Sequence, residues 1–287
     1  MEMDPHFKVA KVHLLPIFTA RVLRELLVFG SSPRVDDARR ALVSISLVDP
    51  DCPIRDVFKQ AYSVLRRAYP AEYVLINECL CAQVSGVDSV VAYREQAVAG
   101  SKADLSIFSP AGHSRGYEIK SRFDRLDRLQ AQLRTYQQVF SHSYVVTDHN
   151  HVPRVMEDSP ASVGVLSVSR DGIQELRPAR ERLDLIRLDR LFSLLRKEEY
   201  LHLIGAKFGA IPKVPNTQIY GVCLQQFQRL DAASAQELVV ETLCRRQSRP
   251  SREEDQAWRL PRPLRALALT GKLDQSELLR LSYVLEQ

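Results

Sequence analysis

The chain has 287 residues, 45% of them hydrophobic and 26% charged, which is ordinary for a globular protein and leaves enough length for a large core. The net charge of +5 mildly favours an anionic partner, although charge says nothing about the fold. No apolar run approaches a membrane span, and residues 1–16 lack a secretion signal, so we expect a cytoplasmic protein without a membrane partner.

Five cysteines are present, which is an odd number. Cys79 and Cys81 form a CxC pair, but no second pair follows at zinc-finger spacing. Reduced, buried thiols are therefore expected.

The first part of the chain is predicted to be helical. Apolar residues at helical spacing over 17–29 end at Gly30, and a second helix is expected over 36–47. Pro53 occupies a favoured first-turn position for the next helix, which Pro70 ends.

A helix over 71–83 precedes a series of strands. The valine-rich stretch 89–99 predicts the first strand, and two more follow in GSKADLSIF and GYEIKS, on either side of a turn over 109–112. A long amphipathic run then leads into the strand SYVVTD. The predicted order is helix, three strands, helix, strand.

The rest of the chain begins with a predicted hairpin and ends in helices. The hairpin joins 163–169 to 173–177 around the turn pair Asp171-Gly172. Helices are expected over 188–204, 218–228, 235–246 and 276–285. We therefore predict three regions, which are a helical lead-in (1–52), an α/β domain (53–180) and a helical C-terminal region (181–287).

Two carboxylates and an ammonium are predicted to converge in the α/β domain. Side chains alternate along a strand, so Glu118 and Lys120 share a face while Ile119 points into the core. The turn over 109–112 would bring Asp104 close to Glu118. With the backbone carbonyl of Ile119, these oxygens suit a divalent metal, and Mg²⁺ or Mn²⁺ is expected.

The helix that follows is predicted to begin near Ser121, which can cap it, with Asp124 in the first turn. Polar residues form one stripe next to a buried apolar stripe, and Gln132 and Tyr136 are neighbours at i,i+4. The polar stripe contains Arg125, Arg128 and Gln132; the apolar stripe contains Leu126, Leu129, Leu133, Tyr136 and Phe140.

These residues resemble a known signature. Asp104, the Glu118-Ile119-Lys120 triplet, Gln132 and Tyr136 resemble the PD-(D/E)XK nuclease superfamily, in its RecB-like branch with a QxxxY extension. The sequence motif SKADL…YEIKS is also similar to a group of uncharacterised bacterial proteins in that superfamily. The resemblance covers about 54–180.

The resemblance implies an αβββαβ restriction-endonuclease-like core with a mixed sheet, extended by helices at both ends. It implies that Asp104 and Glu118 hold the metal, that Lys120 is the catalytic cation, and that Gln132 and Tyr136 line the site. A further carboxylate often comes from the first core helix in this superfamily, and Glu72 is the candidate there, with Glu78 and Glu95 as alternatives.

Plainer explanations exist for each of these residues. Glu118 and Lys120 could be exposed residues of an edge strand, and Tyr136 could simply fill the core. Arg125 and Arg128 could contact phosphate or be solvated charges. His149 and His151 lack a third ligand and are left out of any metal site.

The C-terminal region carries a basic stretch that permits two interpretations. It could track a nucleic-acid backbone, or it could be a soluble linker. Its arginines are Arg245, Arg246, Arg249, Arg252, Arg259, Arg262 and Arg265.

The expected function is a Mg²⁺-dependent nuclease that hydrolyses phosphodiester bonds, with DNA as partner, in defence or DNA processing. Two alternatives stay open. The protein could bind nucleic acid without cutting it, or it could be a defence or regulatory subunit that needs a partner, or a second copy of itself, held through the C-terminal helices. The sequence contains no P-loop and no GxSxG elbow, so neither ATPase nor serine-hydrolase chemistry is indicated.

Overall fold

The computed structural model describes residues 6–85, 90–110, 113–169, 171–247 and 250–287. The chain forms two compact units that are interleaved along the sequence. The first unit comprises Met1–Asp88, Val168–Gln174 and Pro250–Gln287, and the second comprises Ser89–Ser167 and Glu175–Arg249. The first unit thus combines the two ends of the chain. The division into three consecutive regions expected from the sequence stays a prediction.

A mixed sheet of six strands is the central feature, in the order β1-β2-β3-β4-β5-β6. β1 pairs with β2 and β2 with β3 in antiparallel fashion, whereas β3 and β4 are parallel. The strands are β1 (Val91–Val98), β2 (Ser101–Phe108), β3 (Ser114–Lys120), β4 (His142–Asp148), β5 (Gly164–Ser169) and β6 (Gly172–Arg177).

The fold class is therefore α/β with a mixed sheet and flanking helices, as predicted, and the order helix, three strands, helix, strand is present from α5 (Glu72–Gln83) to β4. The sheet is larger than the four strands expected, because the predicted hairpin adds β5 and β6 to its edge. Residues 111–112 of the predicted turn lie outside the described residues. Between β2 and β3, the amide of Ser109 donates a hydrogen bond to the carbonyl of His113 at 3.0 Å.

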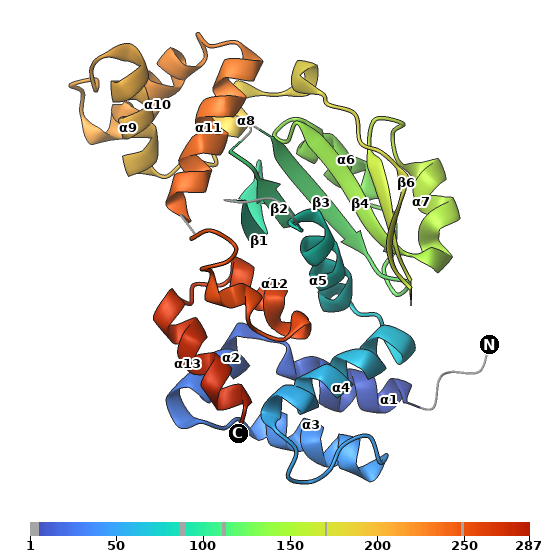
Figure 1. Ribbon diagram of the computed structural model, residues 1–287. Coiled ribbons are helices and arrows are strands. Elements are labelled where there is room, and N and C mark those ends of the chain that lie inside the picture. Colours follow the sequence, from blue (N-terminus) through green and yellow to red (C-terminus); the bar gives the residue numbers. More distant parts are fainter. Residues whose placement is uncertain (1–5, 86–89, 111–112, 170, 248–249) are drawn as a thin grey trace. The chain divides into compact units, whose positions relative to one another are not determined.

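Helices of the second unit pack around this sheet. Figure 1 shows α6 and α7 beside β4, where apolar residues of α6, β4, α7 and β5 form one buried cluster. The helices of this unit are α6 (Leu129–Gln137), α7 (Val152–Asp158), α8 (Leu188–Phe192), α9 (Lys197–Phe208), α10 (Asn216–Phe227) and α11 (Ala232–Arg246).

The helix predicted over 188–204 is two helices, α8 and α9. Arg196 precedes α9, and its amide donates to the Glu199 carboxylate at 2.7 Å, so a new helix begins where apolar spacing alone had suggested continuity. Glu199 also binds Arg246 of α11 through both carboxylate oxygens, at 2.6 and 2.5 Å.

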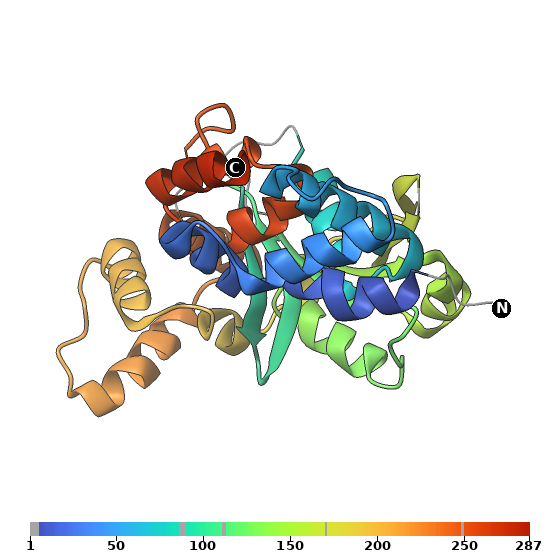
Figure 2. The ribbon, with the colours of Figure 1, turned by 90° about the horizontal axis from the view of Figure 1, so that it is seen from below.

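The first unit is helical and is built from both ends of the chain. Figures 1 and 2 show α13 beside α2. Its helices are α1 (Phe7–Val9), α2 (Ala20–Phe29), α3 (Pro33–Ser44), α4 (Ile54–Ala68), α5, α12 (Arg265–Thr270) and α13 (Gln275–Leu285). The glycine stop predicted for α2 is present, since Gly30 is left-handed (φ 70°) and its amide bonds the Leu26 carbonyl.

Residues 250–287 form part of this folded unit, so the interpretation of the basic stretch as a linker is wrong. Leu260 and Leu264 are buried there, and Arg252 and Arg265 lie over the Trp258 ring at 4.3 and 5.4 Å. Arg249 lies outside the described residues.

All five cysteines are free thiols, three of them buried. None of the helices in the described part of the chain combines the length and apolar character needed to cross a bilayer.

Gly116 provides a test of packing in the second unit. A Cβ added there would collide with the Phe140 ring, which is fully buried. We expect Gly116→Ala to lower the free energy of unfolding by about 1–3 kcal/mol through overpacking. Chemical denaturation of the purified protein measures this.

The matched control is Gly221→Ala in α10, where a Cβ meets no atom within 4 Å. It should be neutral or stabilise by up to about 1 kcal/mol, because alanine favours a helix over glycine. Equal stability of the two variants would contradict the close packing of β3 on Phe140.

Candidate active site

Asp104 lies where strands β2 and β3 separate. Their register pairs Leu105 with Tyr117, and one further step sets Asp104 opposite Glu118. Beyond this point the Asp104 Oδ2 atom, not a β2 carbonyl, accepts the amide of Ile119, at 2.8 Å. The carboxylate of Asp104 is therefore fixed next to the backbone between Glu118 and Lys120.

Glu118 and Lys120 share one face of β3, as predicted. Lys120 Nζ donates to Glu118 Oε1 at 2.6 Å, and the Glu118 and Lys120 side chains are only 1% and 12% exposed. The alternative that both are exposed edge-strand residues is wrong, because β3 pairs with β2 and β4. A carboxylate this deeply buried needs its cation, since removal of one partner of a buried pair typically costs about 3–5 kcal/mol.

Helix α6 brings Tyr136 and Gln132 to the same pair. The Tyr136 hydroxyl donates to Glu118 Oε2 at 2.5 Å, and Lys120 Nζ also donates to Gln132 Oε1 at 3.2 Å. Tyr136 is fully buried, so it both fills the core and reaches the site. The QxxxY spacing thus supplies a donor to the carboxylate and an acceptor to the ammonium.

The pKa of Tyr136 is raised strongly, first by burial and then by the negative charges of Glu118 and Asp104. The phenol therefore keeps its proton at neutral pH and acts as a donor to Glu118.

The predicted helix cap at Ser121 is not present. α6 begins only at Leu129, and Asp124 folds back to accept the Ser121 amide and hydroxyl at 2.7 and 2.6 Å. This local side-chain turn competes with the helix. Arg125 and Arg128 consequently lie in the exposed connection before the helix proper, where Arg125 pairs with Asp127 at 3.0 Å.

The other candidate glutamates belong to other elements of the chain. Glu72 is the exposed first residue of α5 in the first unit, and its role as a metal ligand stays a prediction. Glu95 is exposed and pairs with Lys102 at 3.4 Å. Glu78 is buried in the first unit, where Tyr62 and Arg262 donate to its carboxylate at 2.9 and 2.8 Å.

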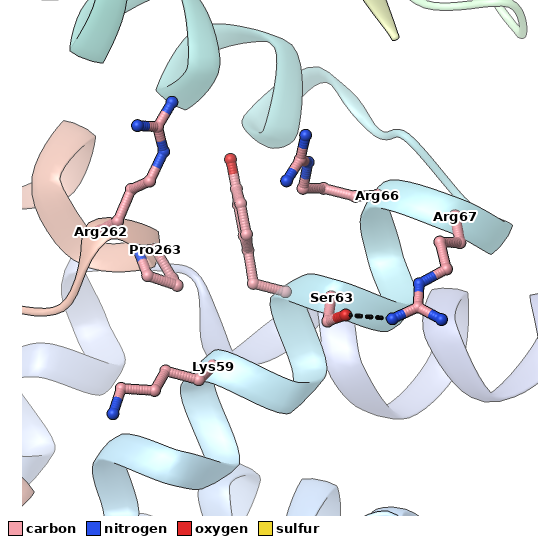
Figure 3. A pocket seen from close by; sticks show the side chains of 7 residues that line it. Lys59, Ser63, Arg66, Arg67, Arg262 and Pro263 are labelled. Atoms are coloured by element: carbon pink, nitrogen blue, oxygen red, sulfur yellow. Dashed lines mark hydrogen bonds between the residues drawn. The ribbon is translucent and has the colours of Figure 1, made fainter. Parts of the chain in front are cut away.

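A basic pocket of about 390 Å³, which was not predicted from the sequence, adjoins Glu78 within the first unit. In Figure 3 the guanidinium groups of Arg66 and Arg262 lie on opposite sides of it. Lys59, Arg66 and Arg67 follow one face of α4, at i, i+7 and i+8, so the helical period of basic residues would have revealed it. Seven residues line the pocket: Lys59, Tyr62, Ser63, Arg66, Arg67, Arg262 and Pro263.

The pocket retains positive charge. Glu78 faces two guanidinium groups, with Arg262 at 2.8 Å and Arg66 at 3.6 Å, and the half-buried Asp56 pairs with Lys59 at 3.1 Å. Arg67 is exposed and donates to the hydroxyl of Ser63 at 2.8 Å. Four cations therefore face two carboxylates, and an anionic group suits the hollow.

The family model described as bacteriophage P4 protein cII matches residues 65–251, which is more than half of the chain. The chain belongs to this family. The match runs from the C-terminal part of α4 past α11, so it includes the whole sheet and the residues gathered around Glu118.

The other comparisons add little. A protein of unknown function from Silicibacter pomeroyi is similar over 42% of this chain and 80% of its own, with 20% sequence identity and a TM-score of 0.30. No curated protein matches significantly.

Tyr136→Phe tests the contact to Glu118. The change removes the hydroxyl and leaves a buried carboxylate oxygen without its donor, so we expect the free energy of unfolding to fall by about 1–3 kcal/mol. Tyr200→Phe is the control, because Tyr200 is also buried and its hydroxyl makes no hydrogen bond to another residue that the structure describes. Similar losses in both variants would contradict a role for the hydroxyl.

The same variant has a signature at high pH. The pKa of Tyr136 is raised in the folded state, so above about pH 10 the unfolded chain loses this proton first and stability falls as pH rises. Tyr136→Phe should lack this contribution to the loss of stability. The difference in free energy of unfolding between the parent and the variant should therefore narrow from pH 9 to pH 11.

Proposed function

We propose that the protein is a metal-dependent nuclease that hydrolyses phosphodiester bonds, with DNA as substrate, on an αβββαβ restriction-endonuclease-like core. One observation carries this proposal: the Asp104 carboxylate accepts the Ile119 amide, between Glu118 and Lys120, and Gln132 and Tyr136 contact that pair. An edge strand with incidental charges would not require this network.

The donor set fits a hard divalent cation. Mg²⁺ and Mn²⁺ take oxygen ligands, and the site offers the carboxylates of Asp104 and Glu118 with the carbonyl of Ile119. Each carboxylate oxygen can accept two bonds, so the contacts of Glu118 to Lys120 and Tyr136 leave capacity for a metal. When bound, such a metal would lower the pKa of a water and stabilise charge on the phosphate.

The residues of the chain would then divide the remaining work. Lys120 is held from two sides by Glu118 and Gln132, so its positive charge is fixed before substrate arrives. A fixed cation stabilises the negative charge that develops on the phosphate in the transition state. Tyr136 donates to Glu118 and so holds the carboxylate in place for a metal.

A second candidate function is nucleic-acid binding without cleavage. The basic pocket of the first unit favours it, because four cations around one hollow suit a phosphate regardless of any chemistry at Asp104. The two functions are compatible, and variants that affect each centre separately distinguish them.

Cleavage should depend on the metal and on the carboxylates. Purified protein is incubated with linear, circular and single-stranded DNA, with Mg²⁺, with Mn²⁺ and with EDTA. We expect cutting only with metal, and a loss of about 100-fold or more in Asp104→Asn. Cutting in EDTA at the full rate would exclude this mechanism.

A double variant separates catalysis from stability. Lys120→Met alone would leave Glu118 charged and buried, whereas Lys120→Met with Glu118→Gln removes both charges and should be close to neutral for stability. We expect this double variant to melt like the parent and to be inactive.

Gln132→Ala should likewise lower the cleavage rate more than the melting temperature, and a folded but fully active Gln132→Ala protein would contradict its placement in the site.

Binding should depend on the pocket. Lys59→Ala with Arg67→Ala removes two exposed charges and should weaken DNA binding while lowering the slope of log Kd against log salt by up to about 2. Arg24→Ala with Arg40→Ala is the control for net charge, because these exposed arginines do not line the pocket. Equal weakening in both pairs would mean that the pocket has no special role.

A further inference from the structure

Three potential metal ligands lie near the starts of β3 and β4, at the opposite end of β3 from Lys120. The two strands are parallel and Arg115 pairs with His142, so both begin at the same edge of the sheet. His113 directly precedes β3, and His142 is the first residue of β4. The imidazole rings are 5.8 Å apart between centroids, at 79°.

Backbone contacts hold these segments together. The Ser141 amide donates to Ser114 Oγ at 2.9 Å, and the Ser114 amide donates to Ser141 Oγ at 3.2 Å. The Arg182 amide donates to the Ser141 carbonyl at 2.9 Å, which brings the preceding residue, Glu181, to the same edge. All of these residues belong to the second unit.

The hydrogen bonds also indicate which nitrogen of His142 is available. Ser141 Oγ lies 3.1 Å from His142 Nδ1, but its single proton is donated to the Ser114 carbonyl at 2.9 Å. This arrangement favours a proton on Nδ1 that is donated to Ser141. This leaves the lone pair on Nε2, which is the arrangement seen in histidines that bind metals.

The ligand atoms of His113, His142 and Glu181 all lie within 4.8 Å of one another. Ligands of one tetrahedral zinc ion lie about 2.0–2.2 Å from the metal. Because His113 and Glu181 are exposed, small rotations of their side chains can bring the three ligand atoms close enough together to bind one ion.

We propose that His113, His142 and Glu181 form a zinc site that is separate from the carboxylate centre. Two imidazoles and one carboxylate are a donor set typical of zinc, whereas Mg²⁺ avoids nitrogen ligands. Glu181 supplies the negative charge, which offsets the nearby Arg115. The ion would tie the connection before β3, the start of β4 and the segment after β6 to one another, so its main effect is on stability.

The test uses the full chain carrying a tag without histidines, stripped of metal by a chelator that is then removed. Zinc is titrated by calorimetry in excess Mg²⁺, which occupies the carboxylate centre, and thermal melts are recorded with and without zinc. We expect one zinc per chain and a higher melting temperature with zinc, since binding to the folded state alone is stabilising. Cobalt in place of zinc should give the visible absorption of a tetrahedral site.

Four variants decide the assignment. His142→Ala should abolish zinc binding, and Glu181→Gln, which keeps the volume of the side chain, should weaken it by about tenfold or more. Asp104→Ala and His202→Ala should bind as the parent does, because His202 lies exposed on α9, away from these residues. If the parent binds no zinc, or if Glu181→Gln and His142→Ala bind like the parent, the proposal is wrong. Loss of binding in Asp104→Ala instead would place the zinc at the carboxylate centre and overturn it equally.

Discussion

The buried charge of Glu118 is the constraint on which the second unit depends. A carboxylate that is 1% exposed needs polar partners, and the structure supplies them from two elements, with Lys120 on the same strand and Tyr136 on α6. These contacts also fix where α6 lies on the sheet. The same bonds that make the charge tolerable therefore assemble the proposed active site, so a single substitution at Glu118 alters stability and chemistry together.

Polar groups are used in a similar way elsewhere in the chain. In the first unit, Glu78 is buried between Tyr62, Arg66 and Arg262, and the side chain of Asn77 bonds the Arg262 carbonyl and the Ala266 amide. This network joins α5 to a segment near the C-terminus and leaves basic side chains around an open pocket. A charge buried for structural reasons thus gathers cations at a surface where an anion can be bound.

Family membership and geometry contribute different information. The match to the bacteriophage P4 protein cII family covers the sheet and shows that the chain belongs to that family, but it assigns no reaction. The nuclease proposal rests on the contacts among Asp104, Glu118, Lys120, Gln132 and Tyr136. The zinc proposal rests on a different set of contacts at the other end of β3, and either one can fail without the other.

The sequence by itself determined the α/β class, the order of elements from α5 to β4, and the shared face of Glu118 and Lys120, because these follow from local periodicity and strand alternation. It could not determine where α6 begins, since the bonds of Asp124 to Ser121 outcompeted the helix over the first turns. It also could not join the ends of the chain into one unit or place Glu181 beside His113 and His142. Those arrangements depend on contacts between residues far apart in the sequence, such as the amide of Arg182 on the carbonyl of Ser141, which only the tertiary structure brings within hydrogen-bonding distance.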